Sequence, residues 1–189
     1  TRTSLLPYLH EFTDDEDVVL LELLNQIATC MTFLGGPQYL PATFSILNTL
    51  ALHEDSTIRH HSINVMLSFL PYLTPQQPVI IRHVLPTIRH FVIHEWSTAR
   101  TSAVALLPHI YPLVPYHIPN ELCSIFAALA IDESPSVRCA ASRQYIILAS
   151  YALHDERLAR LLFHLIVYLS KDVLDHVSLT CVDRFLMLS

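Results

Sequence analysis

The chain has 189 residues, of which 52% are hydrophobic and 15% are charged, so it is too apolar for a disordered protein. Its formal net charge is −6 at pH 7 and Lys171 is its only lysine, so it lacks the basic patch that a nucleic-acid-binding protein requires. The only two glycines, Gly35 and Gly36, are adjacent, which excludes the spaced glycines of a P-loop, a dinucleotide-binding turn or a nucleophile elbow.

The segment 23–53 contains no Asp, Glu, Lys or Arg, which raises the question of a membrane-spanning helix. However, Gly35-Gly36-Pro37 divides it, and Asn, Gln and Thr side chains are scattered through both halves. Two buried helices of a globular protein are therefore the better interpretation, and we expect no membrane partner.

A pattern of two amphipathic segments separated by an acidic turn recurs along the chain. Its aligned positions are separated by 39, 41, 38 and 40 residues; they are Val19, Ile58, Ala99, Val137 and Val177. A period near forty that is divided into two helices is typical of HEAT repeats. The sequence therefore predicts an all-α fold, a HEAT-repeat α-solenoid that is a right-handed stack of about five antiparallel helix pairs.

The predicted solenoid is a single array over residues 1–189. Its repeats are expected at about 1–36, 37–75, 76–115, 116–153 and 154–189. The first helices are expected, in chain order, near 3–12, 38–52, 77–93, 117–130 and 155–170. The second helices are expected near 15–33, 55–72, 96–113, 134–152 and 173–188.

The turns inside the repeats carry a second regularity. Arg59, Arg100 and Arg138 occupy the same place in successive repeats, while Asp14, Asp132 and Asp172 each lie six residues before that place. When repeats stack, an arginine of one repeat can reach an aspartate of its neighbour, which would form a structural arginine–aspartate ladder. The alternative is direct contact with a partner protein. The ladder is favoured for the aspartates, and the two interpretations are equal for the arginines.

Local signals also place the starts of the second helices. An Asp, Ser or Thr side chain there can accept hydrogen bonds from free backbone N–H groups, and Pro135 sits near a first helical position, where its missing N–H costs little. The acidic cluster 14–17 fits such a capping turn better than a calcium loop, because it lacks the interleaved ligands and the glycine of an EF-hand.

Three strings are more specific than the repeat pattern: Gly35-Gly36-Pro37-Gln38-Tyr39, the segment 95–103 (EWSTARTSA) and the segment 132–138 (DESPSVR). Together with residues 1–7 (TRTSLLP), they make the whole chain resemble the scaffold (A, structural) subunit of protein phosphatase 2A, from its second to its sixth repeat of fifteen. The departures are His60, Thr101 and Cys139 at places where that family often has a second basic residue, and Ser178 in place of a turn arginine.

The resemblance implies a horseshoe of helix pairs that is not an enzyme and has no cofactor or metal. It implies that the turns inside the repeats bind the regulatory B subunit, and that the catalytic subunit binds later repeats, outside the matched ones. Carried over to this sequence, the candidate partner-binding residues are Glu54, Asp55, Arg59, Trp96, Arg100, Glu133, Ser134, Pro135 and Arg138.

Trp96 is the best supported of these partner-binding candidates. It is the only tryptophan, and it lies in a predicted turn among polar residues rather than within an apolar helical face. Large aromatic side chains at exposed turns are enriched as binding anchors, so contact with a partner is favoured over local packing.

Two other functions compete with this interpretation. A HEAT-repeat carrier of the nuclear-import type shares the architecture but holds cargo with its inner helices, and it has no reason to carry both specific strings. An all-helical metal-dependent hydrolase would use histidines such as His90 and His94, four residues apart, with His83 upstream. A metal site is disfavoured because there is no HExxH motif and no cysteine nearby in sequence.

The cysteines bear on the compartment. Cys30, Cys123, Cys139 and Cys181 are too widely spaced for a CxxC motif, so we expect free thiols in a reducing environment. With the resemblance, this predicts a location in the cytoplasm and also in the nucleus.

Overall fold

The computed structural model describes residues 11–34, 40–73, 77–115, 118–153 and 155–186. Within these ranges every regular element is a helix and no strand occurs, so the predicted all-α class is confirmed. The chain divides into two compact units, one up to Thr87 and the other from Ile88 onward. Each unit is described by itself.

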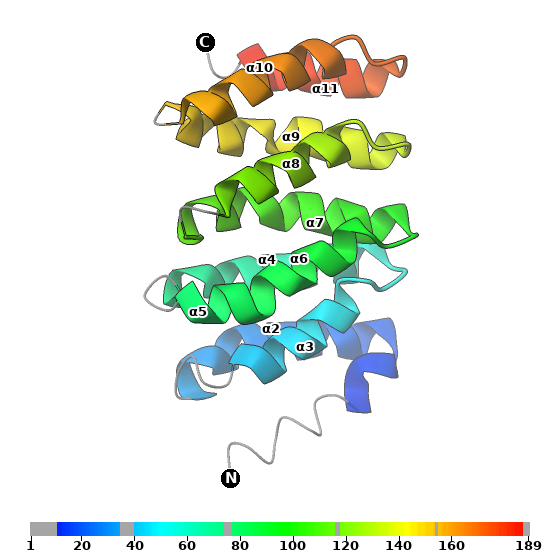
Figure 1. Cartoon of the computed structure of the whole chain (residues 1–189). Coiled ribbons are helices and arrows are strands. Elements are labelled where there is room, and N and C mark those ends of the chain that lie inside the picture. The colour runs from blue at the N-terminus through cyan, green and yellow to red at the C-terminus, as the bar shows by residue number, and fades with distance from the viewer. Residues whose placement is uncertain (1–10, 35–39, 74–76, 116–117, 154, 187–189) are drawn as a thin grey trace. The chain divides into compact units, whose positions relative to one another are not determined.

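Unit 1 contains a short 3-10 turn and then helices that alternate in direction (Figure 1). The central helix α4 packs against both α2 and α3, and Phe44 meets Phe69 edge to face across the α3–α4 contact. The elements are η1 (Phe12–Asp14), α2 (Asp17–Leu34), α3 (Leu40–Leu50), α4 (Ser56–Leu73), α5 (Gln77–Val79) and a π-helical segment (Ile80–Val84). This segment continues into α6 (Leu85–Val92), whose residues from Ile88 onward belong to unit 2.

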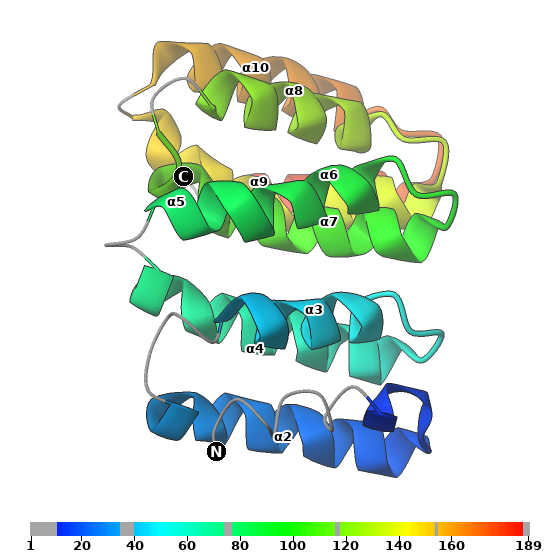
Figure 2. The same ribbon diagram turned by 60° about the horizontal axis from the view of Figure 1, so that its bottom comes forward.

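Unit 2 consists of helices in two layers, with α8 and α10 in one layer and α7, α9 and α11 in the other (Figures 1 and 2). Helix α9 is central, because it packs against all four of the others. The helices are α7 (Ser97–Ile110, followed by a 3-10 turn Tyr111–Leu113), α8 (Pro119–Ala130), α9 (Pro135–Ala152), α10 (Glu156–Leu169) and α11 (Asp175–Leu186).

The predicted helix bounds agree with the described ones to within two residues at each end, except that α7 ends at Ile110, three residues before the predicted 113, and a 3-10 turn follows it. The expected first helix near 3–12 lies almost wholly outside the described residues, as does the string 35–39. Helix α10 has one apolar face, on which Leu158, Leu162, Leu165 and Leu169 are buried. The reason is the 3.6-residue period, which places these four leucines on one side of the helix.

The helix predicted as regular over 77–93 departs from α geometry. Its segment Ile80–Val84 is π-helical, and the N–H of Leu85 donates to the carbonyl of Ile80, five residues earlier. Pro86 follows directly after Leu85 and has no N–H with which to continue the regular α pattern. The helix ends at Val92, so His94 lies in the following turn and not in the same helix as His90, four residues before it.

Candidate functional site

The turns that join paired helices lie on one side of unit 2, at the α6–α7, α8–α9 and α10–α11 connections (Figure 1). We call this side the turn face and define it as residues 93–96, 131–134 and 170–174. The α3–α4 turn in unit 1, residues 51–55, is built in the same way and is described beside it.

Each turn arginine closes its own turn. Nη1 of Arg59 donates to the carbonyls of His53 and Glu54, at 2.7 and 2.5 Å. Nη1 of Arg100 does the same at 3.0 and 2.8 Å, and Nη1 of Arg138 at 2.8 and 3.1 Å, in each case to the residues six and five positions earlier. In each case the guanidinium satisfies two backbone carbonyls of the turn itself.

Two of the arginines also bind the next turn. Arg138 donates from Nε and Nη2 to the two carboxylate oxygens of Asp172, at 2.6 and 3.1 Å. Arg100 donates in the same way to Asp132, at 2.7 and 3.0 Å. The arginine–aspartate ladder is therefore confirmed for these two pairs, whereas Asp14 belongs to the first turn and its side chain is exposed.

The ladder pairs are shielded from water, and Asp172 has only 4% of its side chain exposed. The hydrogen bonds from Arg138 hold the pKa of the Asp172 carboxyl below its usual value, and burial only partly opposes this effect. The same bonds raise the pKa of Arg138. Because the bonds are bidentate, they set the orientation of one turn relative to the next as well as lowering the free energy of the fold.

The residue six positions before each turn arginine, or before Ser178 in the last turn, has a further role. Oδ1 of Asp132 accepts the N–H of Ser134 at 2.8 Å, and Oδ1 of Asp172 accepts the N–H of Leu174 at 3.0 Å. At the equivalent places Nδ1 of His53 accepts the N–H of Asp55 at 3.1 Å, and Nδ1 of His94 accepts that of Trp96 at 3.2 Å.

This geometry requires the tautomer of each histidine in which Nδ1 carries no proton. Sequence reasoning considered His94 only as a candidate metal ligand and did not foresee this acceptor role. The alignment of the two histidines with Asp132 and Asp172 was the available signal, because a histidine can replace an aspartate as the acceptor while offering no carboxylate to an arginine.

The capping and the proline predicted at the starts of the second helices are observed in part. Asp55 caps α4, since its Oδ1 accepts the N–H groups of Thr57 and Ile58 at 2.7 and 3.2 Å. Pro135 is the first residue of α9, as expected. Ser134 and Trp96 precede α9 and α7, but neither side chain forms a capping bond, so the general expectation of a side-chain cap does not hold for these two helices. The carboxylate of Asp132 takes the Ser134 N–H instead.

Trp96 lies at the surface, with 56% of its area exposed, so the predicted exposed turn is confirmed. Its ring contacts His94 at a centroid distance of 5.2 Å, and the His94 ring meets His90 edge to face at 5.7 Å. The backbone bond from Trp96 to His94 and the ring contact hold the residue in place, while more than half of its area remains exposed.

The structure places the other predicted site residues at different depths. Glu54 and Glu133 are exposed, Arg100 is buried, and the rest are half-buried: Asp55, Arg59, Ser134, Pro135 and Arg138. Partner binding by these residues stays a prediction. Since the guanidinium groups of Arg100 and Arg138 are engaged within the protein, both have a structural role, and any influence of theirs on a partner would be through the shape of the turns.

A second polar cluster lies at the opposite end of the helices of unit 2 and was not foreseen from the sequence. The hydroxyl of Tyr111 donates to Oδ2 of Asp155 at 2.9 Å, while Oδ1 of Asp155 caps α10. Burial, supported by the bond to Asp155, raises the pKa of Tyr111, and burial raises the pKa of the nearby Cys123 thiol. Both groups are therefore in their neutral forms at pH 7, which indicates a structural link and not a reactive centre.

Two features considered from the sequence, a metal site and a membrane-spanning helix, are not found in the described part of the chain. No group of three or more His, Cys, Asp or Glu residues there is arranged to hold a metal ion. Among the same residues, no helix has the length and apolar character needed to cross a membrane.

Comparison with curated proteins gives several relatives, although no protein-family model matches the chain. The PP2A 65 kDa regulatory subunit of Drosophila melanogaster is 35% identical over 144 residues, which is 76% of this chain and 24% of the relative. The A beta isoform of the 65 kDa regulatory subunit of Rattus norvegicus is 32% identical over 142 residues (75% and 23%), and the corresponding PP2A regulatory subunit of Schizosaccharomyces pombe is 30% identical over 143 residues (73% and 23%).

These matches confirm the resemblance inferred from the turn strings. The chain spans about a quarter of the length of the curated relatives it matches. Those relatives are named as regulatory subunits, which supports the expected non-enzymatic role.

Solved structures support the fold. A designed armadillo repeat protein in complex with the peptide (KR)4 has a TM-score of 0.52 at 16% identity, covering 95% of this chain and 81% of that chain. A second designed armadillo repeat protein has a TM-score of 0.50 at 17% identity, covering 95% and 80%. At such low identity the likeness concerns the fold alone, and it confirms an all-α solenoid of repeated helices.

Proposed function

This chain is a relative of the 65 kDa regulatory subunits of protein phosphatase 2A, and we propose that it acts as a non-catalytic scaffold in a serine/threonine phosphatase of that type. The turns inside its repeats bind the regulatory B subunit, and the catalytic subunit is held by other repeats of the whole protein. The proposal includes a cytoplasmic and nuclear location, which the free thiols of Cys123 and Cys139 support.

The observation that carries this proposal is the construction of the turn face. The guanidinium groups of Arg100 and Arg138 form hydrogen bonds that hold the turns, while Trp96 and the carboxylate of Glu133 extend into solvent. An exposed aromatic side chain on a rigid turn loses little conformational freedom on binding, so it is a favourable anchor. Rigid turns with protruding side chains suit a scaffold better than they suit catalysis, which needs converging reactive groups.

The experiment measures binding of the chain to a purified regulatory B subunit of protein phosphatase 2A by calorimetry or biolayer interferometry. We expect Trp96→Ala to weaken binding by about 2 kcal/mol, as removal of an aromatic anchor does. The matched control is Phe163→Ala, because Phe163 is an aromatic residue of α10 outside the turn face with 66% of its area exposed. No binding by the unmodified chain, or equal losses in the two variants, would contradict the proposal.

A further inference from the structure

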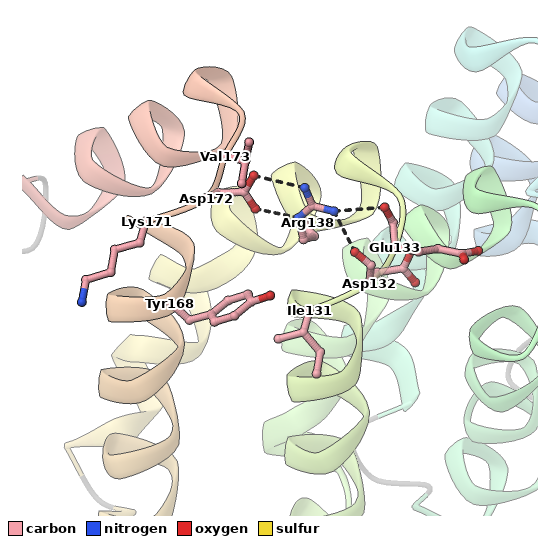
Figure 3. Close-up of a pocket in the computed structure, with 8 residues that line it drawn as sticks. All are labelled: Ile131, Asp132, Glu133, Arg138, Tyr168, Lys171, Asp172 and Val173. Atoms are coloured by element: carbon pink, nitrogen blue, oxygen red, sulfur yellow. Dashed lines mark hydrogen bonds and ion pairs between the residues drawn. The ribbon is translucent and has the colours of Figure 1, made fainter.

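The α8–α9 and α10–α11 turns enclose a groove of about 440 Å3 on the turn face of unit 2. Its walls are Ile131 from the first turn and Tyr168 and Val173 from the second helix pair. Figure 3 shows the Tyr168 ring directed toward Ile131, with the Arg138–Asp172 ion pair beside them.

The ion pair gives the groove a polar base in which four of the five N–H groups of Arg138 are shown in bonds within the chain. Nε and Nη2 of Arg138 bind Asp172, and Nη1 binds two carbonyls of its own turn. A phosphate or carboxylate ligand that took the paired Nε and Nη2 bonds of Arg138 would have to displace Asp172, whose side chain is buried and also accepts the N–H of Leu174. The groove is therefore unsuited to an anion bound at Arg138.

The walls favour an apolar ligand group. Ile131 and Tyr168 keep 55% and 52% of their areas exposed although they face the same groove, and Val173 is exposed as well. A side chain inserted between them would remove apolar surface from water on three sides without disturbing a hydrogen bond within the described residues.

The two ends of the groove differ in charge. Lys171 lies at one end and forms no ion pair within the described part of the chain, while Glu133 lies at the other (Figure 3). The Glu133 carboxylate is highly exposed and has only a long contact of 3.4 Å with Arg100. An extended ligand that crosses both ends would meet a negative group and then a positive group, which gives it one preferred direction.

We propose that this groove holds a segment of the regulatory B subunit in which an apolar side chain is flanked by a basic residue on one side and an acidic residue on the other. The apolar side chain lies between Ile131 and Tyr168, the basic residue pairs with Glu133, and the acidic residue pairs with Lys171. This inference rests on the proposed function and adds to it the chemistry of the bound segment.

The first test compares binding of the purified regulatory B subunit to variants of the whole 189-residue chain. Tyr168→Ala is expected to weaken binding at least about tenfold, while Phe163→Ala on the same helix changes it by less than about twofold. Glu133→Lys and Lys171→Glu are each expected to weaken binding about fivefold at low salt, and less at high salt.

The double variant Glu133→Lys with Lys171→Glu exchanges the charges at the two ends of the groove and leaves the net charge unchanged. It therefore tests whether binding depends on the order of these charges or only on the net charge. We expect it to bind more weakly than either single variant, because both ends of the segment would then meet like charges. The matched control exchanges the exposed ion pair of α10, as Glu156→Lys with Arg160→Glu, and should bind as the unmodified chain does. Binding by the Glu133/Lys171 double variant equal to that of the unmodified chain would overturn the inference.

A photo-crosslinking residue at position 168 identifies the bound segment directly by mass spectrometry. Crosslinking to a segment with the stated order of basic, apolar and acidic residues supports the inference, and crosslinking elsewhere overturns it. If the unmodified chain does not bind the B subunit, the proposed function fails, and synthetic peptides then test the groove alone.

For that case the probe is KAFAE, compared with EAFAE and KASAE by NMR on the isotope-labelled chain. Shifts at Tyr168 and Ile131 that are strongest with KAFAE would support the groove, and equal or absent shifts would overturn it.

Discussion

Asp172 is bound on two sides at once: its carboxylate accepts two hydrogen bonds from Arg138 of the preceding helix pair, and its Oδ1 also accepts the N–H of Leu174 in its own turn. One buried side chain therefore joins the α8–α9 turn to the α10–α11 turn. If it is removed, the Arg138 guanidinium is left with unmatched donors in a site that water reaches poorly.

Asp172→Ala is expected to lower the free energy of unfolding of unit 2 by about 3 kcal/mol, since loss of one member of a buried ion pair leaves the other uncompensated. Chemical denaturation followed by circular dichroism measures the change. Asp175→Ala serves as the control, because Asp175 is exposed at the start of α11 and its loss should cost less than about 1 kcal/mol. Equal losses in the two variants would show that the ladder contributes no more than an exposed carboxylate.

Acid should weaken the same link. Because the bonds from Arg138 lower the pKa of Asp172 in the folded chain, the unfolded chain binds the proton more tightly. The stabilisation is therefore complete above the ordinary aspartate value of about 4 and is lost as the pH falls below it toward the lower folded value. Denaturation series from neutral pH down to pH values well below the ordinary aspartate value should show a steeper fall for the unmodified chain than for Asp172→Asn, and parallel curves would contradict this.

The turn arginines should differ in importance. Arg59 binds only carbonyls of its own turn among the described residues of unit 1, whereas Arg100 also binds Asp132, which is largely buried. We expect Arg59→Met to lower the free energy of unfolding by about 1 kcal/mol, as loss of turn hydrogen bonds does. Arg100→Met should lower it by about 3 kcal/mol, because Asp132 would be left unpaired. Hydrogen exchange of the amides of α4 and α7 would locate the two effects, and a larger loss at Arg59 would refute the distinction.

His94 is expected to stabilise the α6–α7 turn through Nδ1, which accepts the N–H of Trp96. His94→Ala removes the partner of the Trp96 N–H and the ring beneath the indole, so it should cost about 1 kcal/mol. His94→Asn places an oxygen within reach of the same N–H and should retain much of that stability. Since Trp96 is the only tryptophan, its fluorescence reports directly on this turn, and identical spectra for the Ala and Asn variants would argue against the bond.

The sequence by itself determined the pairing of helices and the places of the turns, because the forty-residue period and the 3.6-residue apolar face are local patterns that leave few arrangements of the chain. It also determined which side chains could join neighbouring repeats, since an offset of 34 residues from Arg138 to Asp172 follows from the period. The exposure of Trp96 was foreseen because its neighbours in sequence are polar.

Only the tertiary structure decided how those side chains share their bonds. Which partners Arg138 binds depends on rotamers set by the packing of α9 between its neighbours. The groove exists because the two turns, although joined by Arg138 and Asp172, leave space between Ile131 and Tyr168. The acceptor role of His94 likewise depends on the path of the backbone after α6. These features arise from the distances between stacked helix pairs, which a pattern of residue types does not specify.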